Sequence, residues 1–219
     1  MRAYVITILD NEQSVKAAEN CIRSGAPQGI IINKWKATTP ADMPFEMLAE
    51  KGIDGTKLDE VYSRADNCAA AFLSHYSLWE ECMKIQEPIM IFEHDAVIVD
   101  TISERILNGQ CFKQMMNIGK PSYGQFRTPA FIGSGPLTSK KYFPGAHAYI
   151  VKPAAARQLI QATKGLGAAP TDVFIHKDKF PFLEEYYPWP VEARDSFTTI
   201  QAKEGCLAKH NYNEDYKIV

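Results

Sequence analysis

Two acidic side chains, Glu93 and Asp95, follow directly on an apolar run from Ile89 to Phe92. An unbroken apolar run of this kind is typical of a strand that is buried on both faces, as in a parallel sheet covered by helices. In open α/β sheets, ligands bind just beyond the carboxyl ends of such strands. Carboxylate oxygens placed there suit a divalent cation, and the cation in turn suits phosphate groups. The pattern therefore indicates a metal-dependent enzyme that acts on a phosphorylated donor.

Two further side chains carry chemistry that such an enzyme needs. Asp172 follows Pro170 and precedes the apolar residues 173–175, where partial loss of solvent would raise its pKa toward the range of a general base. The alternative is that Thr171 or Asp172 begins a helix as its N-cap. His147 stands at the start of a predicted strand and is a candidate third ligand for a cation. A lone histidine in such a place is more often a surface or packed residue.

Three more polar side chains lie near these groups in the sequence. Ser74 and His75 fall on a helix that we expect over about 66–86, where adjacent side chains do not face each other, so the pair is not a hydrolase dyad. We expect structural roles, with His75 hydrogen-bonded beneath the site, and direct contact with the donor is the alternative. His94 either coordinates the cation or points to the opposite face and packs.

The composition narrows the class of protein. The chain has 219 residues, which indicates one domain, and its formal net charge of −2 makes nucleic acid an unexpected partner. No apolar run approaches the roughly 20 residues of a membrane helix, and residues 1–6 are typical of a first strand rather than a signal peptide. The five cysteines form no C-x-x-C pair, so we expect free thiols and a cytoplasmic protein.

Alternating strand and helix signals indicate an α/β fold with a parallel sheet. Predicted strands cover residues 3–8, 29–32, 89–92, 96–99 and 147–151, and predicted helices cover about 11–23, 45–50, 66–86, 101–107 and 153–163. The segment 119–145 holds five glycines and four prolines and is typical of a functional lid or binding loop. Its cations Arg127, Lys140 and Lys141 are candidates to neutralise a diphosphate, although exposed loop cations usually only interact with solvent.

Three blocks of the chain resemble glycosyltransferase family 25, which includes bacterial lipooligosaccharide galactosyltransferases and collagen galactosyltransferase domains. The blocks are 4–10 (YVITILD), similar to the opening strand; 68–95, with Ser74-His75, Leu78-Trp79 and the motif IFEHD; and 145–200, with AYIV at 148–151, Ala155-Ala156, PTD at 170–172, and 196–200. The chain departs from the family pattern at two points. No arginine follows soon after the first strand, and His94 stands where a second aspartate is usual.

The resemblance implies an A-type glycosyltransferase fold, which is a single α/β domain with a Rossmann-like, mostly parallel sheet flanked by helices. We therefore expect one domain over residues 1–219, with a donor-binding part at about 1–118 and an acceptor-side part at about 119–219. The resemblance also implies a nucleotide-sugar donor, most often a UDP-hexose carrying galactose or glucose. Mn²⁺ or another divalent cation and inversion at the anomeric carbon complete the implied reaction.

In such a reaction, a cation offsets the charge of the leaving diphosphate and a carboxylate accepts the proton of the acceptor hydroxyl. We assign Asp172 as the general base, the cation ligands to Glu93, Asp95 and His147, and the donor contacts to Thr7, Leu9, Asp10, Ser74, His75 and Glu93. The acceptor is a glycan or another hydroxyl compound. One alternative is a metal-dependent hydrolase that uses Glu93, Asp95 and histidines such as His75 and His147. The other is a non-catalytic nucleotide-sugar-binding protein with the same fold.

Overall fold

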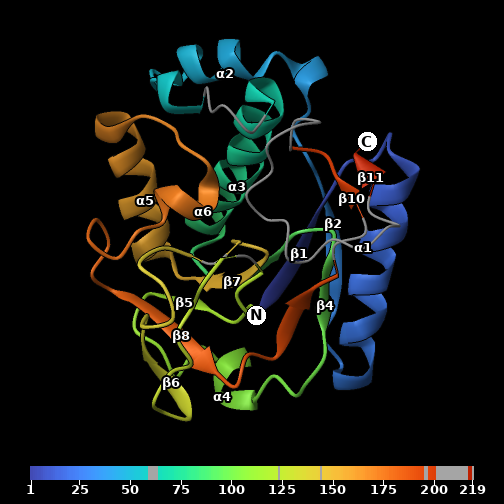
Figure 1. Cartoon of the computed structure of the whole chain (residues 1–219), viewed down its shortest axis with the longest axis vertical. Helices are drawn as coiled ribbons and strands as arrows, with labels where there is room; N and C mark the ends of the chain where they lie inside the picture. Colours follow the sequence, from blue (N-terminus) through green and yellow to red (C-terminus); the bar gives the residue numbers. More distant parts are fainter. Residues whose placement is uncertain (59–63, 123, 144, 195–196, 201–216, 219) are drawn as a thin grey trace.

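A central sheet with helices on both faces organises the computed structural model, which describes residues 1–58, 64–122, 124–143, 145–194, 197–200 and 217–218 (Figure 1). The main sheet contains β1 (Arg2–Thr7), β2 (Ile32–Lys36), β3 (Ile89–Phe92), β5 (Met115–Asn117), β6 (Gly133–Pro136), β7 (Ala148–Val151) and β8 (Leu183–Tyr187). Across the described residues these seven strands lie in the order β2-β1-β3-β7-β5-β8-β6. Strands β2, β1, β3, β5 and β8 run in one direction, and β7 and β6 run against them.

The helices and two small strand pairs surround this sheet. The α-helices are α1 (Glu12–Gly25), α2 (Pro44–Glu50), α3 (Ala65–Ile85), α4 (Glu104–Leu107), α5 (Pro153–Leu166) and α6 (Thr171–Phe174), and 3-10 helices cover Ala26–Gln28, Pro40–Asp42 and Thr56–Leu58. Strand β4 (Ala96–Ile98) pairs with β9 (Val191–Ala193), and β10 (Phe197–Thr198) pairs with β11 (Lys217–Ile218). No helix in the described part of the chain has the length and apolar character that a membrane span requires.

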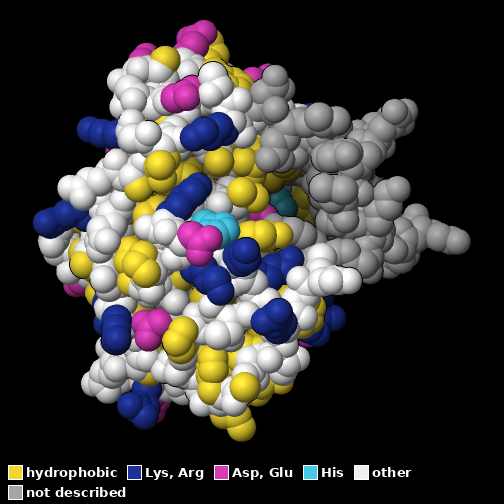
Figure 2. Space-filling model, turned by 60° about the vertical axis from the view of Figure 1, so that its left-hand side comes forward, with side chains coloured by type: hydrophobic (Ala, Val, Ile, Leu, Met, Phe, Trp, Pro, Cys, Tyr) yellow, Lys and Arg dark blue, Asp and Glu magenta, His cyan; other side chains and the backbone are white. Residues whose placement is uncertain are grey.

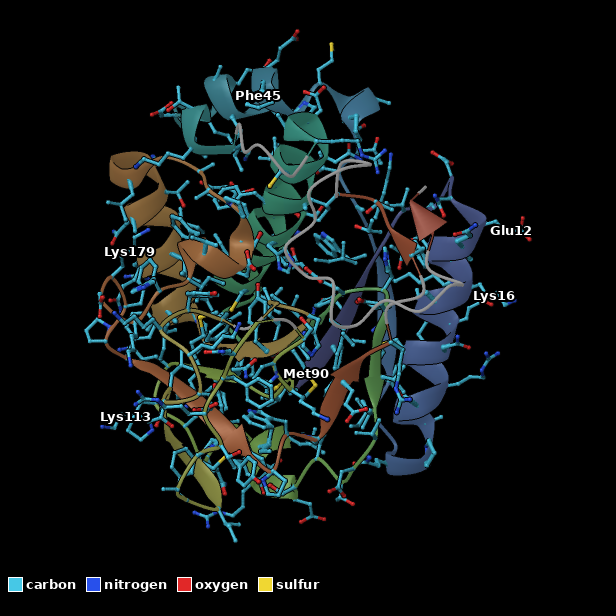
Figure 3. The ribbon with its side chains drawn as sticks, in the orientation of Figure 1. Glu12, Lys16, Phe45, Met90, Lys113 and Lys179 are labelled. Atoms are coloured by element: carbon cyan, nitrogen blue, oxygen red, sulfur yellow. The ribbon has the colours of Figure 1, made fainter. Side chains whose placement is uncertain are left out.

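The buried strand β3 separates two apolar cores. Ile89 and Ile91 pack into the core beneath α3 and α5, while Met90 and Phe92 pack into the core beneath α1. Successive strand side chains point to opposite faces, so both faces of β3 must be apolar. Figure 3 shows Met90 inside the molecule, whereas Glu12 and Lys16 project outward from α1. The prediction of a strand buried on both faces is therefore confirmed.

Helix α3 is the main support of the larger core. Its residues Phe72 and Trp79 contact Phe174 of α6 at ring-centroid distances of 5.3 and 6.0 Å. The helix ends at Ile85, and the next residue, Gln86, adopts a left-handed conformation with φ of 55°. Pro88 prevents the helix from continuing, because helical geometry is disfavoured for the residue before a proline. Strand β3 begins at the next residue, Ile89. The end of α3 and the short strand β3 together place Glu93 directly after the last residue of β3.

The structure corrects the expected start of one strand and agrees with the expectation of a mostly parallel sheet. Strand β2 begins at Ile32 rather than at Gly29, because Gly29 has φ of 68° and ends the preceding 3-10 helix. The polar residues of β2 are tolerated because it is an edge strand with solvent on one side. Strand β7 is antiparallel to both of its neighbours, so the sheet is mixed even though most strands share one direction. The expected α/β architecture with flanking helices is confirmed.

Candidate functional site

The order of the strands reverses at β1, which lies next to the edge strand β2. Strand β2 lies on one side of β1 and β3 lies on the other, and all three are parallel. A reversal of this kind opens a crevice at the carboxyl ends of the strands, and ligands commonly bind there. The turn 93–95 follows β3 and residues 8–11 follow β1, so both candidate segments flank this point.

Glu93 and His147 lie opposite each other on neighbouring strands. Beyond the pair Phe92 and Ala148, the Glu93 N–H donates to the His147 carbonyl at 2.9 Å. Opposite residues of antiparallel strands point to the same face, with Cβ atoms roughly 5 Å apart. Both side chains therefore lie on the face that carries Ile91 and Tyr149, toward α3. The structure therefore places the backbones of these two predicted cation ligands side by side.

Two glycines make room for the imidazole of His147, which is only 2% exposed. A Cβ atom on Gly119 would lie 2.5 Å from His147 Nε2, and one on Gly145 would lie 3.0 Å from Nδ1. Gly145 also has φ of 106°, which favours glycine on conformational grounds. The buried position excludes the interpretation of His147 as a surface residue.

Glu93 is held from below by a buried histidine on α3. His75 Nε2 lies 3.1 Å from Glu93 Oε1, and His75 Nδ1 lies 2.9 Å from the Tyr149 hydroxyl. The Trp79 indole N–H donates to the same hydroxyl at 2.9 Å. Burial lowers the pKa of His75 to about 3, with the nearby Asp172 carboxylate opposing the shift. His75 is therefore a neutral imidazole at neutral pH, hydrogen-bonded beneath the site.

The two remaining residues of the acidic turn have different neighbours. His94 Nδ1 lies 2.9 Å from Ser14 Oγ on α1, and the His94 ring stacks on Phe197 at 5.0 Å. The packed alternative is therefore the one that the structure shows for His94. Burial raises the pKa of the Cys21 thiol on α1 to about 12, and the Asp95 carboxylate adds to the shift. Asp95 thus lies near α1, whereas Glu93 contacts α3.

Asp172 lies beside the same buried histidine. It stands in the first turn of α6, where the cap position is Pro170 and no side chain caps the helix. The N-cap alternative for Thr171 or Asp172 therefore does not describe this helix. Burial lowers the pKa of Lys140, and the Asp172 carboxylate opposes that shift. Asp172 is consequently close enough to act on both His75 and Lys140.

Lys140 is the buried member of the three loop cations. It is 8% exposed, whereas Arg127 and Lys141 are exposed. The preceding residues are fixed by the fully buried Glu185, whose Oε1 accepts from the N–H groups of residues 138 and 139 at 2.6 and 2.8 Å. Sequence reasoning grouped Lys140 with the exposed cations. The contact that holds residues 138–139 comes from Glu185 of β8, which is distant in the sequence, so no local pattern indicates that Lys140 is buried.

The residues assigned to donor contacts fall into two groups. Leu9 and Asp10 are exposed beyond the end of β1, at the point where the strand order reverses. Thr7 is fully buried, and its hydroxyl donates to the Val5 carbonyl at 3.0 Å. Ser74 Oγ accepts from the Thr38 N–H at 2.9 Å and donates to a carbonyl of its own helix, so it ties α3 to the chain beyond β2. A contact of these residues with a donor stays a prediction.

The described residues contain no group of three or more His, Cys, Asp or Glu side chains arranged to hold a metal ion. Glu93 and His147 nevertheless supply a carboxylate oxygen and an imidazole nitrogen on one face of the sheet. Cations that act on nucleotides are often bound by one or two carboxylates together with substrate phosphates. The pair therefore fits a cation whose coordination is completed by a ligand.

Basic side chains gather on the face shown in Figure 2, around histidine and acidic side chains in its middle. Sequence reasoning missed two supporting residues, Tyr149 and Trp79. A signal for them existed, because a tyrosine hydroxyl in a fully buried strand requires a hydrogen-bond partner.

Comparisons with known proteins add an independent finding. The model of "Glycosyltransferase family 25 (LPS biosynthesis protein)" matches residues 65–175, which is half of the chain. Among solved structures, the chain is similar to A197 from STIV, with a TM-score of 0.48 and 9% identity, over 98% of this chain and 100% of that one. A comparison with curated proteins gives no match. The family match includes α3, the acidic turn, His147 and Asp172.

Proposed function

Because the chain belongs to glycosyltransferase family 25, we propose that it is an inverting, cation-dependent enzyme that moves a hexose from a UDP-hexose to a hydroxyl acceptor. Family membership implies a sugar donor and an acceptor in general terms. The proposal adds an A-type glycosyltransferase fold, galactose or glucose as the sugar, and a glycan or other hydroxyl compound as acceptor. It also assigns the donor to residues of about 1–118 and the acceptor to residues of about 119–219.

The observation that carries the proposal is the shared position of Glu93 and His147 at the carboxyl end of β3, with Asp172 nearby. A nucleotide diphosphate needs positive charge at its phosphates, and an acceptor needs a base. Both requirements would be met on one face of the sheet, beside the point where the strand order reverses.

Glu93 and His147 would hold Mn²⁺ or another divalent cation together with donor oxygens. Asp95 is the third proposed ligand, although it lies nearer to α1 than to the α3 side on which Glu93 is held. When bound, such an ion offsets the negative charge that grows on a departing diphosphate. The exposed Leu9 and Asp10 lie where the nucleoside would be recognised. His75 orients the Glu93 carboxylate from beneath, and the buried position of His147 restricts access of water to that side.

Asp172 would accept the proton of the acceptor hydroxyl. Inversion requires that the hydroxyl attack from the side opposite to the leaving diphosphate, so the base must lie apart from the phosphates yet within the same crevice. Asp172 comes from α6, whereas Glu93 follows β3, and both are close to His75. Replacement Asp172→Asn keeps the size of the side chain and removes its basicity.

A panel of nucleotide-sugars tests the proposal through release of nucleoside diphosphate, with and without Mn²⁺ and with candidate acceptors. We expect release from a UDP-hexose that depends on both Mn²⁺ and acceptor. The Asp172→Asn variant should bind the donor normally, as measured by thermal shift, and lose transfer by about 10²–10⁴-fold. Full transfer by this variant would remove Asp172 from the role of base.

Other outcomes separate the alternatives. Nucleotide binding without turnover of any donor would favour a non-catalytic binding protein with this fold. Indifference to nucleotides together with a response to Zn²⁺ would favour the hydrolase. That hydrolase needs several converging protein ligands, and no such group of three is present among the residues that the structure describes.

A further inference from the structure

We propose that Trp79, Tyr149 and His75 form a hydrogen-bond chain of fixed direction in which His75 donates a hydrogen bond to Glu93 Oε1 and so orients this carboxylate toward the donor. The chain has three contacts, of 2.9, 2.9 and 3.1 Å, and begins at an indole that can only donate. The inference rests on the proposed function, because it assigns Glu93 to the donor side of the reaction.

The direction follows from the capacity of each group. The Trp79 N–H occupies one lone pair of the Tyr149 oxygen, so the Tyr149 hydroxyl hydrogen is available for His75 Nδ1. With Nδ1 as acceptor, the proton of a neutral imidazole must reside on Nε2. Nε2 then donates to the Glu93 carboxylate, which is an acceptor when ionised.

The reverse direction is unfavourable at two positions. With a proton on His75 Nδ1, the Tyr149 oxygen would accept two hydrogen bonds. The Tyr149 hydroxyl hydrogen, which is buried, would then have no acceptor among the three side chains Trp79, His75 and Glu93. An unsatisfied buried donor costs about 1–3 kcal/mol. It would also place the lone pair of Nε2 against a carboxylate oxygen at 3.1 Å, which is repulsive.

Packing keeps the members of the chain in place. His75 and Trp79 are four residues apart on α3, so they lie on the same helix face. The His75 and Tyr149 rings are stacked at 5.7 Å, and Trp79 is stacked on Phe174 at 6.0 Å. All three members are nearly or fully buried, which strengthens each hydrogen bond by excluding water. The chain therefore acts as a rigid support for one oxygen of Glu93.

A histidine tautomer measurement tests the direction without reference to activity. Protein labelled with ¹⁵N at histidine should show His75 with a protonated Nε2 and an unprotonated Nδ1 by two-bond ¹H–¹⁵N correlation. The Tyr149→Phe variant keeps the ring and removes the hydroxyl, so this tautomer should lose its dominance. A proton found on Nδ1 in the unmodified protein would overturn the proposal, whether or not the enzyme transfers sugar.

Substitutions of His75 test the consequence for Glu93. Glutamine carries its amide nitrogen at about the position of Nε2, whereas asparagine is too short to reach Glu93. We expect His75→Gln to retain most of the donor affinity and His75→Asn to lose it by about 10-fold or more, with Tyr149→Phe between them. The matched control is Tyr76→Phe, at a buried tyrosine outside the chain, and it should match the unmodified protein.

The two readouts separate failure of this inference from failure of the proposed function. Donor binding that is equally weakened in His75→Gln and His75→Asn would contradict the orienting role. If the predicted tautomer is found but the protein binds no nucleotide, the hydrogen-bond direction stands. The role of the chain in orienting Glu93 toward a donor and the proposed function are then both rejected. Thermal unfolding of each variant establishes that the fold is intact before either conclusion is drawn.

Discussion

Replacement of Gly119 by alanine should displace the imidazole of His147 from its present position. The new Cβ atom would lie 2.5, 2.8 and 3.0 Å from three atoms of the imidazole, where ordinary contacts begin at 3.4 Å. The imidazole must therefore move by roughly 1 Å, and Gly145 lies against its other side. The φ angle of Gly119 is not in the left-handed region, so the effect is steric and does not arise from backbone strain.

Overpacking of this kind costs about 1–3 kcal/mol. For a chain of this size, such a loss lowers Tm by about 2–12 °C. Differential scanning fluorimetry gives the change in Tm, and urea unfolding gives the free energy. Because His147 is a proposed cation ligand, the additional stabilisation by Mn²⁺ with UDP should also fall in Gly119→Ala.

The control is Gly165→Ala on α5. A Cβ atom there meets nothing within 4 Å, and alanine should stabilise the helix by about 0.5–1 kcal/mol. Equal stability and an equal Mn²⁺ response in Gly119→Ala and the unmodified protein would refute the placement of His147 against Gly119. A loss of stability with an unchanged Mn²⁺ response would instead exclude His147 from the cation site.

Two further substitutions probe the surroundings of the site. Glu185→Ala should lower the free energy of unfolding by about 3–5 kcal/mol, because it leaves the N–H groups of residues 138–139 and the Trp189 indole without their buried acceptor. The control Glu80→Ala removes an exposed ion pair and should lower the free energy of unfolding by less than about 1 kcal/mol. Equal losses in urea unfolding would contradict the assigned importance of Glu185. Asp95→Ala should abolish the rise in Tm that Mn²⁺ produces in the presence of UDP, and an undiminished rise would leave Glu93 and His147 as the proposed protein ligands.

Local sequence signals predicted the elements whose environment is uniform along their length. Strand β3 is buried throughout, and α3 repeats buried residues at helical spacing, so both were found with nearly the observed bounds. Strands β5 and β8 were missed. Met115–Asn117 is too short for a periodic pattern, and β8 has two consecutive glutamates between an apolar residue and two aromatic residues, so it shows no strand alternation. The buried Glu185 is stable there because residues 138–139 and the Trp189 indole supply donors.

The place of His147 depends on a long-range pairing that local patterns do not reveal. If β7 were parallel to β3, its amino end would lie at the opposite end of the strands from Glu93, about 13 Å away for a four-residue strand. From the sequence we expected a mostly parallel sheet and assigned no direction to this strand. In the structure β7 is antiparallel to β3, which brings its amino end, and His147 with it, to the carboxyl end of β3. The reversal of one short strand is thus what makes a shared site of Glu93 and His147 geometrically possible.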